Sequence, residues 1–208
     1  MTFTITDFQS TTNVSRETLD RLIGYADLLA KWQKAKNLVS NSTIDDMWLR
    51  HFFDSAQLYI QMKNSFDTMP ETLLDIGSGA GFPGLVLGAM GIENVHMVES
   101  NGKKCSFMSQ VARQMGINAV IHNERIEKID PFSVDIITSR ACAKITQLLE
   151  WSEPFLGNSG IEMWLLKGQT SQEELTEAET YWTMDKECFE SKTEVGANII
   201  RLWNIKRK

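Results

Sequence analysis

A short apolar segment that runs directly into a cluster of glycines narrows the possible folds of this chain more than any other feature. Residues 72–76 predict a buried strand, and the sequence continues as Asp75-Ile76-Gly77-Ser78-Gly79-Ala80-Gly81-Phe82-Pro83-Gly84. Glycines at the end of a strand allow a sharp turn and let a ligand lie against bare backbone. The pattern therefore predicts a strand of an open α/β sheet with a ligand at its carboxyl edge.

After Pro70 the chain continues with alternating strand and helix patterns. We predict further strands over residues 94–98, 119–121, 134–138, 161–166 and 197–205, and helices over residues 83–90, 102–115, 144–155 and 171–182. Strands that alternate with helices in this way form βαβ units and a parallel sheet. Residues 67–208 therefore predict a doubly wound α/β domain.

Residues 1–66 carry helical patterns and no strand pattern. Behind a Ser15 N-cap, apolar residues recur at spacings of three and four from Leu19 to Trp32. A second helix, capped by Thr43 or Ser42, is predicted to follow. We expect a helical N-terminal cap that forms one compact unit with the α/β domain.

Composition and charge are those of an ordinary globular protein. Of the 208 residues 42% are hydrophobic, and 21 Lys and Arg against 27 Asp and Glu give a net charge of −6. This balance argues against a protein that nucleic acid holds by its overall field, although small basic clusters occur. No apolar run approaches the roughly 20 residues that span a bilayer. The start has no secretory pattern, and three distant cysteines predict neither disulfides nor zinc. We expect a cytoplasmic protein with no membrane or metal partner.

The glycine cluster fits the loops of two kinds of cofactor. One pattern, Gly79-x-Gly81-x-x-Gly84, matches the dinucleotide fingerprint, and the other, Gly77-x-Gly79-x-Gly81, matches the loop that binds S-adenosylmethionine (SAM). In either case Glu99, at the end of the second predicted strand, can accept hydrogen bonds from ribose hydroxyls.

Two residues separate these alternatives. Pro83, expected at the first helical position, removes one of the N–H groups that would hold a pyrophosphate. Asp75 places negative charge where a pyrophosphate would lie, whereas the ammonium and sulfonium of SAM favour a carboxylate there. The residues therefore favour SAM over a dinucleotide.

The segment after the fourth predicted strand, residues 138–143, bears on the methyl acceptor. It contains neither an Asn/Asp-Pro-Pro-aromatic motif, which orients exocyclic amines, nor a cysteine beside a proline, which attacks cytosine C5. We expect Cys142 to be a buried structural thiol. The segment is compatible with an acceptor that has a lone pair and no proton to lose, such as guanine N7. Catalysis would then need alignment and exclusion of water.

Several segments together resemble the bacterial ribosomal small-subunit methyltransferase G family, also called glucose-inhibited division protein B. In order, they are residues 25–38, Arg50-His51-Phe52-Phe53-Asp54-Ser55, residues 75–84, Glu99-Ser100-x-x-Lys103-Lys104, Ser139-Arg140-Ala141 and Leu166-Lys167-Gly168-Gln169. The resemblance implies a Rossmann-like class I SAM-dependent methyltransferase fold. It also implies methylation of a guanine at N7 in 16S ribosomal RNA, in a loop near the decoding region.

The resemblance further implies a cofactor site. By this resemblance, Gly77 and Phe82 contact SAM and Glu99 binds its ribose. Ile126 and Glu127 are expected to flank the adenine. The glycine loop adds Asp75, Gly79 and Gly81 to the predicted SAM site. Arg140 is expected to border both the cofactor and the target base, and it is the predicted catalytic residue.

RNA contacts are expected from five residues, Arg50, His51, Lys103, Lys104 and Lys167. Arg50 and Asp54 lie one helical turn apart, so an ion pair between them is the alternative to an RNA contact. With a net charge of −6, a monomer of this kind should bind RNA weakly and depend on the shape of a partly assembled small ribosomal subunit.

Two other functions remain compatible with the residues. One is a dinucleotide-binding oxidoreductase or sensor, which NAD(H) would stabilise against unfolding. The other is a SAM-binding ribosome-assembly factor without turnover. Ligand-induced shifts in melting temperature test the first alternative, and methyl incorporation into small subunits tests the second.

Overall fold

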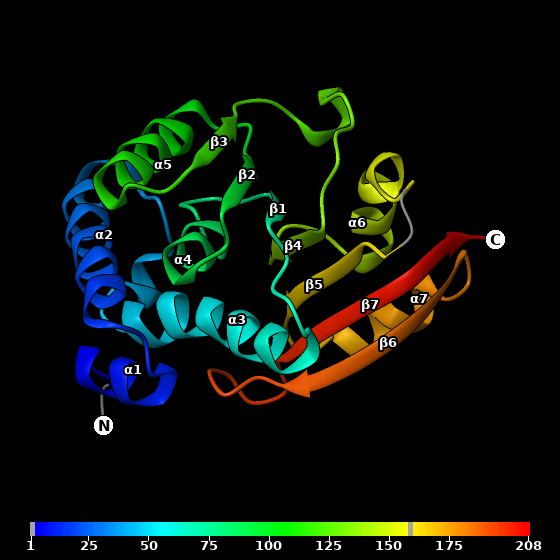
Figure 1. Cartoon of the computed structure of the whole chain (residues 1–208), viewed down its shortest axis with the longest axis horizontal. Coiled ribbons are helices and arrows are strands. Elements are labelled where there is room, and N and C mark those ends of the chain that lie inside the picture. The colour runs from blue at the N-terminus through cyan, green and yellow to red at the C-terminus, as the bar shows by residue number, and fades with distance from the viewer. Residues whose placement is uncertain (1–2, 158–159) are drawn as a thin grey trace.

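A seven-stranded sheet runs through the molecule, whose computed structural model describes residues 3–157 and 160–208 (Figure 1). The first two residues of the predicted N-terminal cap therefore lie outside the described residues. The strands are β1 (Thr72–Ile76), β2 (Asn94–Val98), β3 (Ala119–His122), β4 (Ile136–Arg140), β5 (Glu162–Lys167), β6 (Trp182–Glu190) and β7 (Asn198–Arg207). They lie in the order β3-β2-β1-β4-β5-β7-β6.

The first five strands are parallel, and β7 lies antiparallel between β5 and β6. From β1 the chain proceeds outward through β2 and β3 and then returns to place β4 on the other side of β1. This reversal creates a crevice outside the carboxyl ends of β1 and β4, the usual ligand position in open α/β sheets.

Helices cover both faces of the sheet, because successive strand residues point to opposite faces. Leu73 packs in the core formed with α1 (Ile5–Thr12), α2 (Arg16–Lys36), α3 (Asp54–Ser65), α4 (Gly84–Met90) and α5 (Gly102–Met115). Leu74 packs in the opposite core with α6 (Ile145–Ser152) and α7 (Ser171–Ala178). Within the described residues, no helix is both long and apolar enough to cross a membrane.

The N-terminal helices share one continuous core with one face of the sheet. Tyr25 of α2 is fully buried, and its ring lies 5.0 Å from that of Phe82 and 5.1 Å from that of Phe52. The helices α1, α2, α3, α4 and α5 all contribute side chains to that core. The boundary predicted at residue 66, between the N-terminal cap and the α/β domain, remains a prediction. Residues from both sides of it pack in the same core.

Four expectations about the elements need correction. Neither Ser42 nor Thr43 caps the second N-terminal helix, because both lie in a short 3-10 turn, η1 (Asn41–Thr43), in which the hydroxyl of Thr43 donates to the Ser40 carbonyl. Wider helical turns, η2 (Trp48–Phe53), lead directly into α3. The fourth strand begins at Ile136 rather than at residue 134, because the Asp135 carboxylate accepts from two N–H groups at the start of β1.

The other two corrections concern Pro83 and the predicted helix over residues 171–182. Pro83 precedes α4, which begins at Gly84, so Pro83 is not the first helical residue. The predicted helix over residues 171–182 ends at Ala178, and Asp185, Glu187 and Glu190 belong to β6. Because β6 is an edge strand with mostly exposed side chains, its apolar alternation is too weak to predict a strand.

Candidate active site

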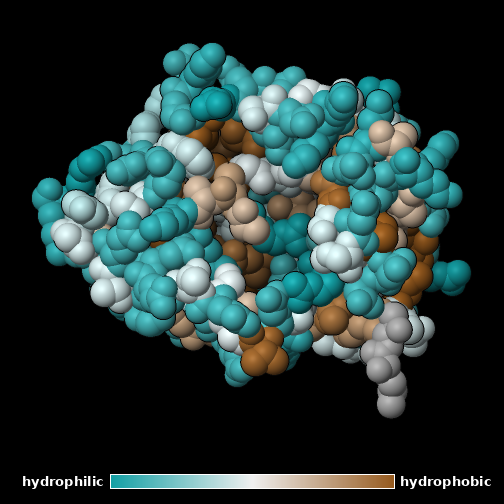
Figure 2. All heavy atoms as spheres, turned by 180° about the vertical axis from the view of Figure 1, so that it is seen from behind, coloured by the Kyte–Doolittle hydropathy of each residue, from teal (hydrophilic) through white to brown (hydrophobic). Residues whose placement is uncertain are grey.

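A pocket of about 690 Å³ lies at the carboxyl ends of the parallel strands. Its lining comes from the loops after β1, β2, β3, β4 and β5, from the segment between α2 and α3, and from the turn between β6 and β7. Figure 2 shows a hollow near the middle of the face opposite to that of Figure 1, with hydrophobic side chains in its depth and hydrophilic ones around it. A pocket of this size accommodates a nucleoside cofactor and part of a second substrate.

The glycine loop after β1 presents bare backbone to the pocket. Gly77 and Gly79 have φ angles of 71° and 60°, in the left-handed region that favours glycine. A Cβ atom on Gly77 would lie 2.2 Å from the sulfur of Cys142, so no side chain fits there. Cys142 is exposed and lines the pocket, which corrects the expectation of a buried structural thiol. Desolvation of its sulfur raises the pKa, so the thiol stays protonated and is a poor nucleophile.

Carboxylates gather at the cofactor end of the pocket. Glu99 follows β2, and its two oxygens accept from the N–H groups of Gly79 (3.1 Å) and Asn101 (2.8 Å). These bonds fix the carboxylate at the pocket edge and leave lone pairs that can accept from ribose hydroxyls. Ile126 and Glu127 line the same end. The negative charge favours a cationic ligand over a pyrophosphate.

Asp75 does not reach this pocket, which corrects its expected contact with SAM. The side chain is fully buried, and its oxygens accept from the Thr138 hydroxyl (3.0 Å) and the Gly84 N–H (3.1 Å). Burial raises the pKa of Asp75 to about 6. Its contacts give it a structural role, in which it ties β1 to β4 and to the start of α4.

The far side of the glycine loop is held by the N-terminal helices. The Tyr25 hydroxyl donates to the Ala80 carbonyl at 2.5 Å, and the Tyr25 ring stacks on Phe82. Phe82 lines the pocket, whereas Gly81 is absent from the described lining. An added Cβ on Gly81 would meet Leu85 at 2.4 Å, so this glycine serves packing behind the loop.

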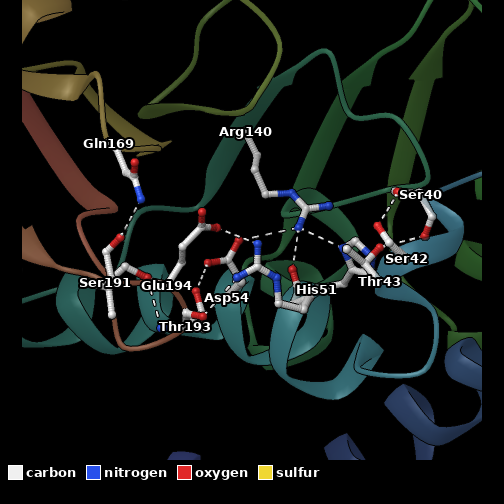
Figure 3. A network of polar contacts seen from close by, with 12 residues as sticks. Ser40, Ser42, Thr43, His51, Asp54, Arg140, Gln169, Ser191, Thr193 and Glu194 are labelled. Atoms are coloured by element: carbon white, nitrogen blue, oxygen red, sulfur yellow. Dashed lines mark hydrogen bonds and ion pairs between the residues drawn. The ribbon is translucent and has the colours of Figure 1, made fainter.

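Arg140, at the end of β4, is held by three acceptors from the N-terminal segment (Figure 3). Its Nη1 donates to the Arg50 carbonyl (3.0 Å), to Nδ1 of His51 (3.0 Å) and more distantly to the Asp54 carboxylate (3.5 Å). The guanidinium carbon lies 5.1 Å from the centre of the Phe82 ring. Arg140 is therefore positioned between the glycine loop and the N-terminal segment.

These contacts fix the protonation state of His51. An arginine only donates, so Nδ1 of His51 accepts and the proton is on Nε2. Nε2 lies 2.9 Å from the Thr43 hydroxyl, which donates its own hydrogen to the Ser40 carbonyl. Burial and then the charge of Arg140 lower the pKa of His51 to about 3. The imidazole is neutral and both nitrogens are engaged.

The turn between β6 and β7 borders the same end of the pocket. Thr193 donates its hydroxyl to Asp54 (2.7 Å), and burial raises the pKa of that carboxyl above its usual value. Arg50 donates to the Thr193 carbonyl (3.0 Å) and to the Glu194 carboxylate (2.5 Å). The ion pair between Arg50 and Asp54, which was the alternative to an RNA contact, does not occur among the described residues, since each residue has another partner.

The predicted lysines differ in position. Lys104 lines the pocket, whereas Lys103 is absent from the described lining. Lys167 also borders the pocket, but its side chain is only 6% exposed, and its ammonium is paired with Glu174 at 2.7 Å and bonded to the Ala143 carbonyl. These partners correct the expectation that Lys167 contacts a phosphate.

Four residues belong to the hydrogen-bonded group around Arg140 and were not predicted from the sequence as site residues. They are Thr43, Asp54, Thr193 and Glu194. Thr193 and Glu194 lie in an acidic C-terminal segment without a recognisable motif. Only Asp54 had a signal, because it belongs to the same short segment as Arg50 and His51. Among the described residues no group of three or more His, Cys, Asp or Glu side chains could hold a metal.

Residues 18–202 match the sequence model of the family described as rRNA small subunit methyltransferase G. A ribosomal RNA small subunit methyltransferase G of Rhodospirillum rubrum is 45% identical over 96% of this chain and 97% of its own length. A relative with the same name from Rhodospirillum centenum is 46% identical over 98% of this chain and 92% of its own length.

Solved structures show the same fold at low sequence identity. Magnesium protoporphyrin IX methyltransferase from Synechocystis PCC 6803, with bound SAM, superposes with a TM-score of 0.61 at 9% identity and covers 86% of this chain and 97% of its own. Ribosomal protein L11 methylase from Lactobacillus delbrueckii superposes with a TM-score of 0.58 at 15% identity, over 75% of this chain and 79% of its own. The sheet of this chain is thus the Rossmann-like sheet of SAM-dependent methyltransferases.

Proposed function

This chain belongs to the rRNA small subunit methyltransferase G family, and we propose that its pocket aligns SAM with a guanine of 16S ribosomal RNA for methyl transfer to N7. The observation that carries the proposal is the division of the pocket into two ends. Glu99 and the glycine loop form an acidic end suited to SAM, and Arg140 and His51 form a cationic and aromatic end suited to a base.

The residues of the cofactor end fit SAM. The left-handed glycines leave backbone exposed, and Glu99 supplies a fixed acceptor for ribose hydroxyls. Ile126 and Glu127 offer an apolar side chain and an acceptor for the adenine, as the family resemblance implies. When bound, SAM supplies a methyl group on a positively charged sulfur.

The base end is suited to a reaction without proton transfer. Guanine N7 has a lone pair and no proton, so the acceptor needs no general base. Neither nitrogen of His51 is available to take or give a proton, because one accepts from Arg140 and the other donates to Thr43. The chain contributes alignment and exclusion of water.

Arg140 positions the base in this proposal. Among the described residues, its hydrogen bonds to protein all use Nη1, which leaves Nη2 and Nε to donate to guanine O6. Asp54 offsets part of the guanidinium charge from 3.5 Å, which reduces repulsion of the methylated base, which is cationic. Arg140 thereby holds the base while opposing the charge that the reaction places on it less than an unpaired guanidinium would.

The test is methyl incorporation from tritiated SAM into small subunits that lack the modification, with identification of the product nucleoside. We expect 7-methylguanosine, and another nucleoside or no incorporation would overturn the proposal. We further propose that the protein acts as a cytoplasmic monomer on partly assembled subunits. Equal rates on deproteinised 16S RNA and on subunits would refute that preference, and sedimentation of the free protein checks its oligomeric state.

A further inference from the structure

Arg50, whose backbone carbonyl accepts from Arg140, already holds an anion with its guanidinium. Its Nη2 lies 2.5 Å from the Glu194 carboxylate, and its Nη1 donates to the Thr193 carbonyl at 3.0 Å. The two side chains of this ion pair are 33% and 44% exposed, so both are accessible at the pocket rim. A guanidinium binds a carboxylate and a phosphate through the same planar set of donors.

The turn that carries Glu194 is attached to the body of the protein by polar contacts. Thr193 bonds to Asp54, and Gln57 bonds to the Lys192 N–H (2.7 Å) and the Ser191 hydroxyl (3.3 Å). At the tip, Val195 is 86% exposed and does not anchor the turn by burial. The contacts of Gln57 and Ser191 are buried and hold the backbone of the turn, whereas the Glu194 side chain is 44% exposed and can exchange its contact for one to water.

The position of Arg50 is fixed relative to the base end. Its backbone carbonyl accepts from Nη1 of Arg140 at 3.0 Å, so the two arginines are neighbours in one hydrogen-bonded group. A strand of RNA that places a base beside Arg140 must bring its own phosphates close to Arg50. At net charge −6, the protein offers an RNA phosphate few alternatives to such local cations.

We propose that Arg50 is a binding site for a phosphate of the RNA strand that carries the target base, and that Glu194 occupies this site until the phosphate displaces it. This inference rests on the proposed function, since it names how the same site receives its RNA. Glu194 acts as an internal competitor. It keeps the guanidinium oriented while RNA is absent and lowers affinity for RNA that cannot place a phosphate there.

The test measures the dissociation constant for small subunits that lack the modification, at several salt concentrations. Glu194→Gln removes the competing charge, and we expect binding about two- to five-fold tighter, the range of an exposed ion pair. Glu190→Gln is the matched control. Glu190 is exposed on β6 and forms no ion pair among the described residues, so this variant changes the net charge equally.

Arg50→Gln is the second arm. We expect binding about ten-fold weaker or more, and a slope of log K against log salt that is smaller by about 0.7 to 0.9, since one phosphate contact is lost. In the Arg50→Gln background, Glu194→Gln should change binding no more than Glu190→Gln does. A SAM-induced rise in melting temperature shows that each variant is folded.

The outcomes separate this inference from the proposed function. If Glu194→Gln binds no tighter than Glu190→Gln, displacement of Glu194 is refuted. If Arg50→Gln retains the wild-type affinity and salt slope, the phosphate site is refuted. In both cases methylation of guanine N7 by the wild-type protein would still stand. If the wild-type protein binds subunits without methylating them, the proposed function fails while the binding comparison remains valid.

Discussion

Replacing His51 with phenylalanine should remove a specific acid sensitivity of the fold. The imidazole of His51 has an ordinary pKa of 6.5 in the unfolded chain and of about 3 in the folded protein. Below pH 6.5 the unfolded chain takes up a proton at this position and the folded protein does not, so acid favours unfolding. The stability that the neutral ring contributes is complete above pH 6.5 and is lost as the pH falls towards 3.

The magnitude follows from these two pKa values. Between pH 7 and pH 5 this one residue should lower the free energy of unfolding by about 2 kcal/mol, and the full shift corresponds to about 5 kcal/mol. The side chain is only 6% exposed, so solvent screens this effect little. His51→Phe keeps an aromatic ring against Phe82, which lies 5.1 Å from the imidazole, and has no proton to take up.

The assay is urea unfolding at both pH values, followed by tryptophan fluorescence, for the wild-type protein and His51→Phe. Other groups that titrate in this range, such as Asp75, are present in both proteins and cancel in the comparison. The wild-type protein should lose about 2 kcal/mol more than the variant. Parallel losses in the two proteins would show that His51 is protonated in the folded state and would refute the deduced hydrogen-bond directions.

Three further predictions concern the pocket. Arg140→Gln should reduce methyl transfer by about a hundred-fold or more while the SAM-induced rise in melting temperature remains, and loss of that rise would show that Arg140 mainly binds the cofactor. Tyr25→Phe leaves the buried Ala80 carbonyl of the glycine loop without its donor, so it should lower the free energy of unfolding in urea by about 1–3 kcal/mol and raise the KM for SAM. An unchanged KM would show that Tyr25 does not position the loop for SAM. Gly77→Ala should abolish SAM binding in calorimetry because its Cβ would lie 2.2 Å from the sulfur of Cys142, whereas Gly157→Ala, in open space, should bind normally, and equal binding by both would contradict the steric argument.

Local patterns were sufficient to predict the parallel half of the sheet and the glycine loop. Strands β1, β2 and β5 lie within one or two residues of their predicted bounds, because buried parallel strands are nearly continuous apolar runs with turns at their ends. The glycine loop was recognisable because left-handed backbone requires glycine at Gly77 and Gly79.

The acceptor side of the site was less predictable, because its contacts join segments that are distant in sequence. Nothing local to Thr193 shows that its hydroxyl bonds to Asp54, and the edge position of β6 hides its strand pattern. Asp75 illustrates the opposite error. Its spacing from the glycines suggested a ligand contact, whereas its carboxylate holds the strand and helix together behind the loop.

The placement of β7 between β5 and β6 has a consequence for how the chain acquires activity during synthesis. Arg50 and Glu194 are 144 positions apart in the sequence. The base end of the pocket, which their contact borders, therefore forms only after Glu194 has been synthesised. A nascent protein still attached to its own ribosome can form the nucleotide-binding crossover early, and it lacks the turn that borders the base end. The base end of the pocket is therefore completed only when the hairpin of β6 and β7 docks against β5.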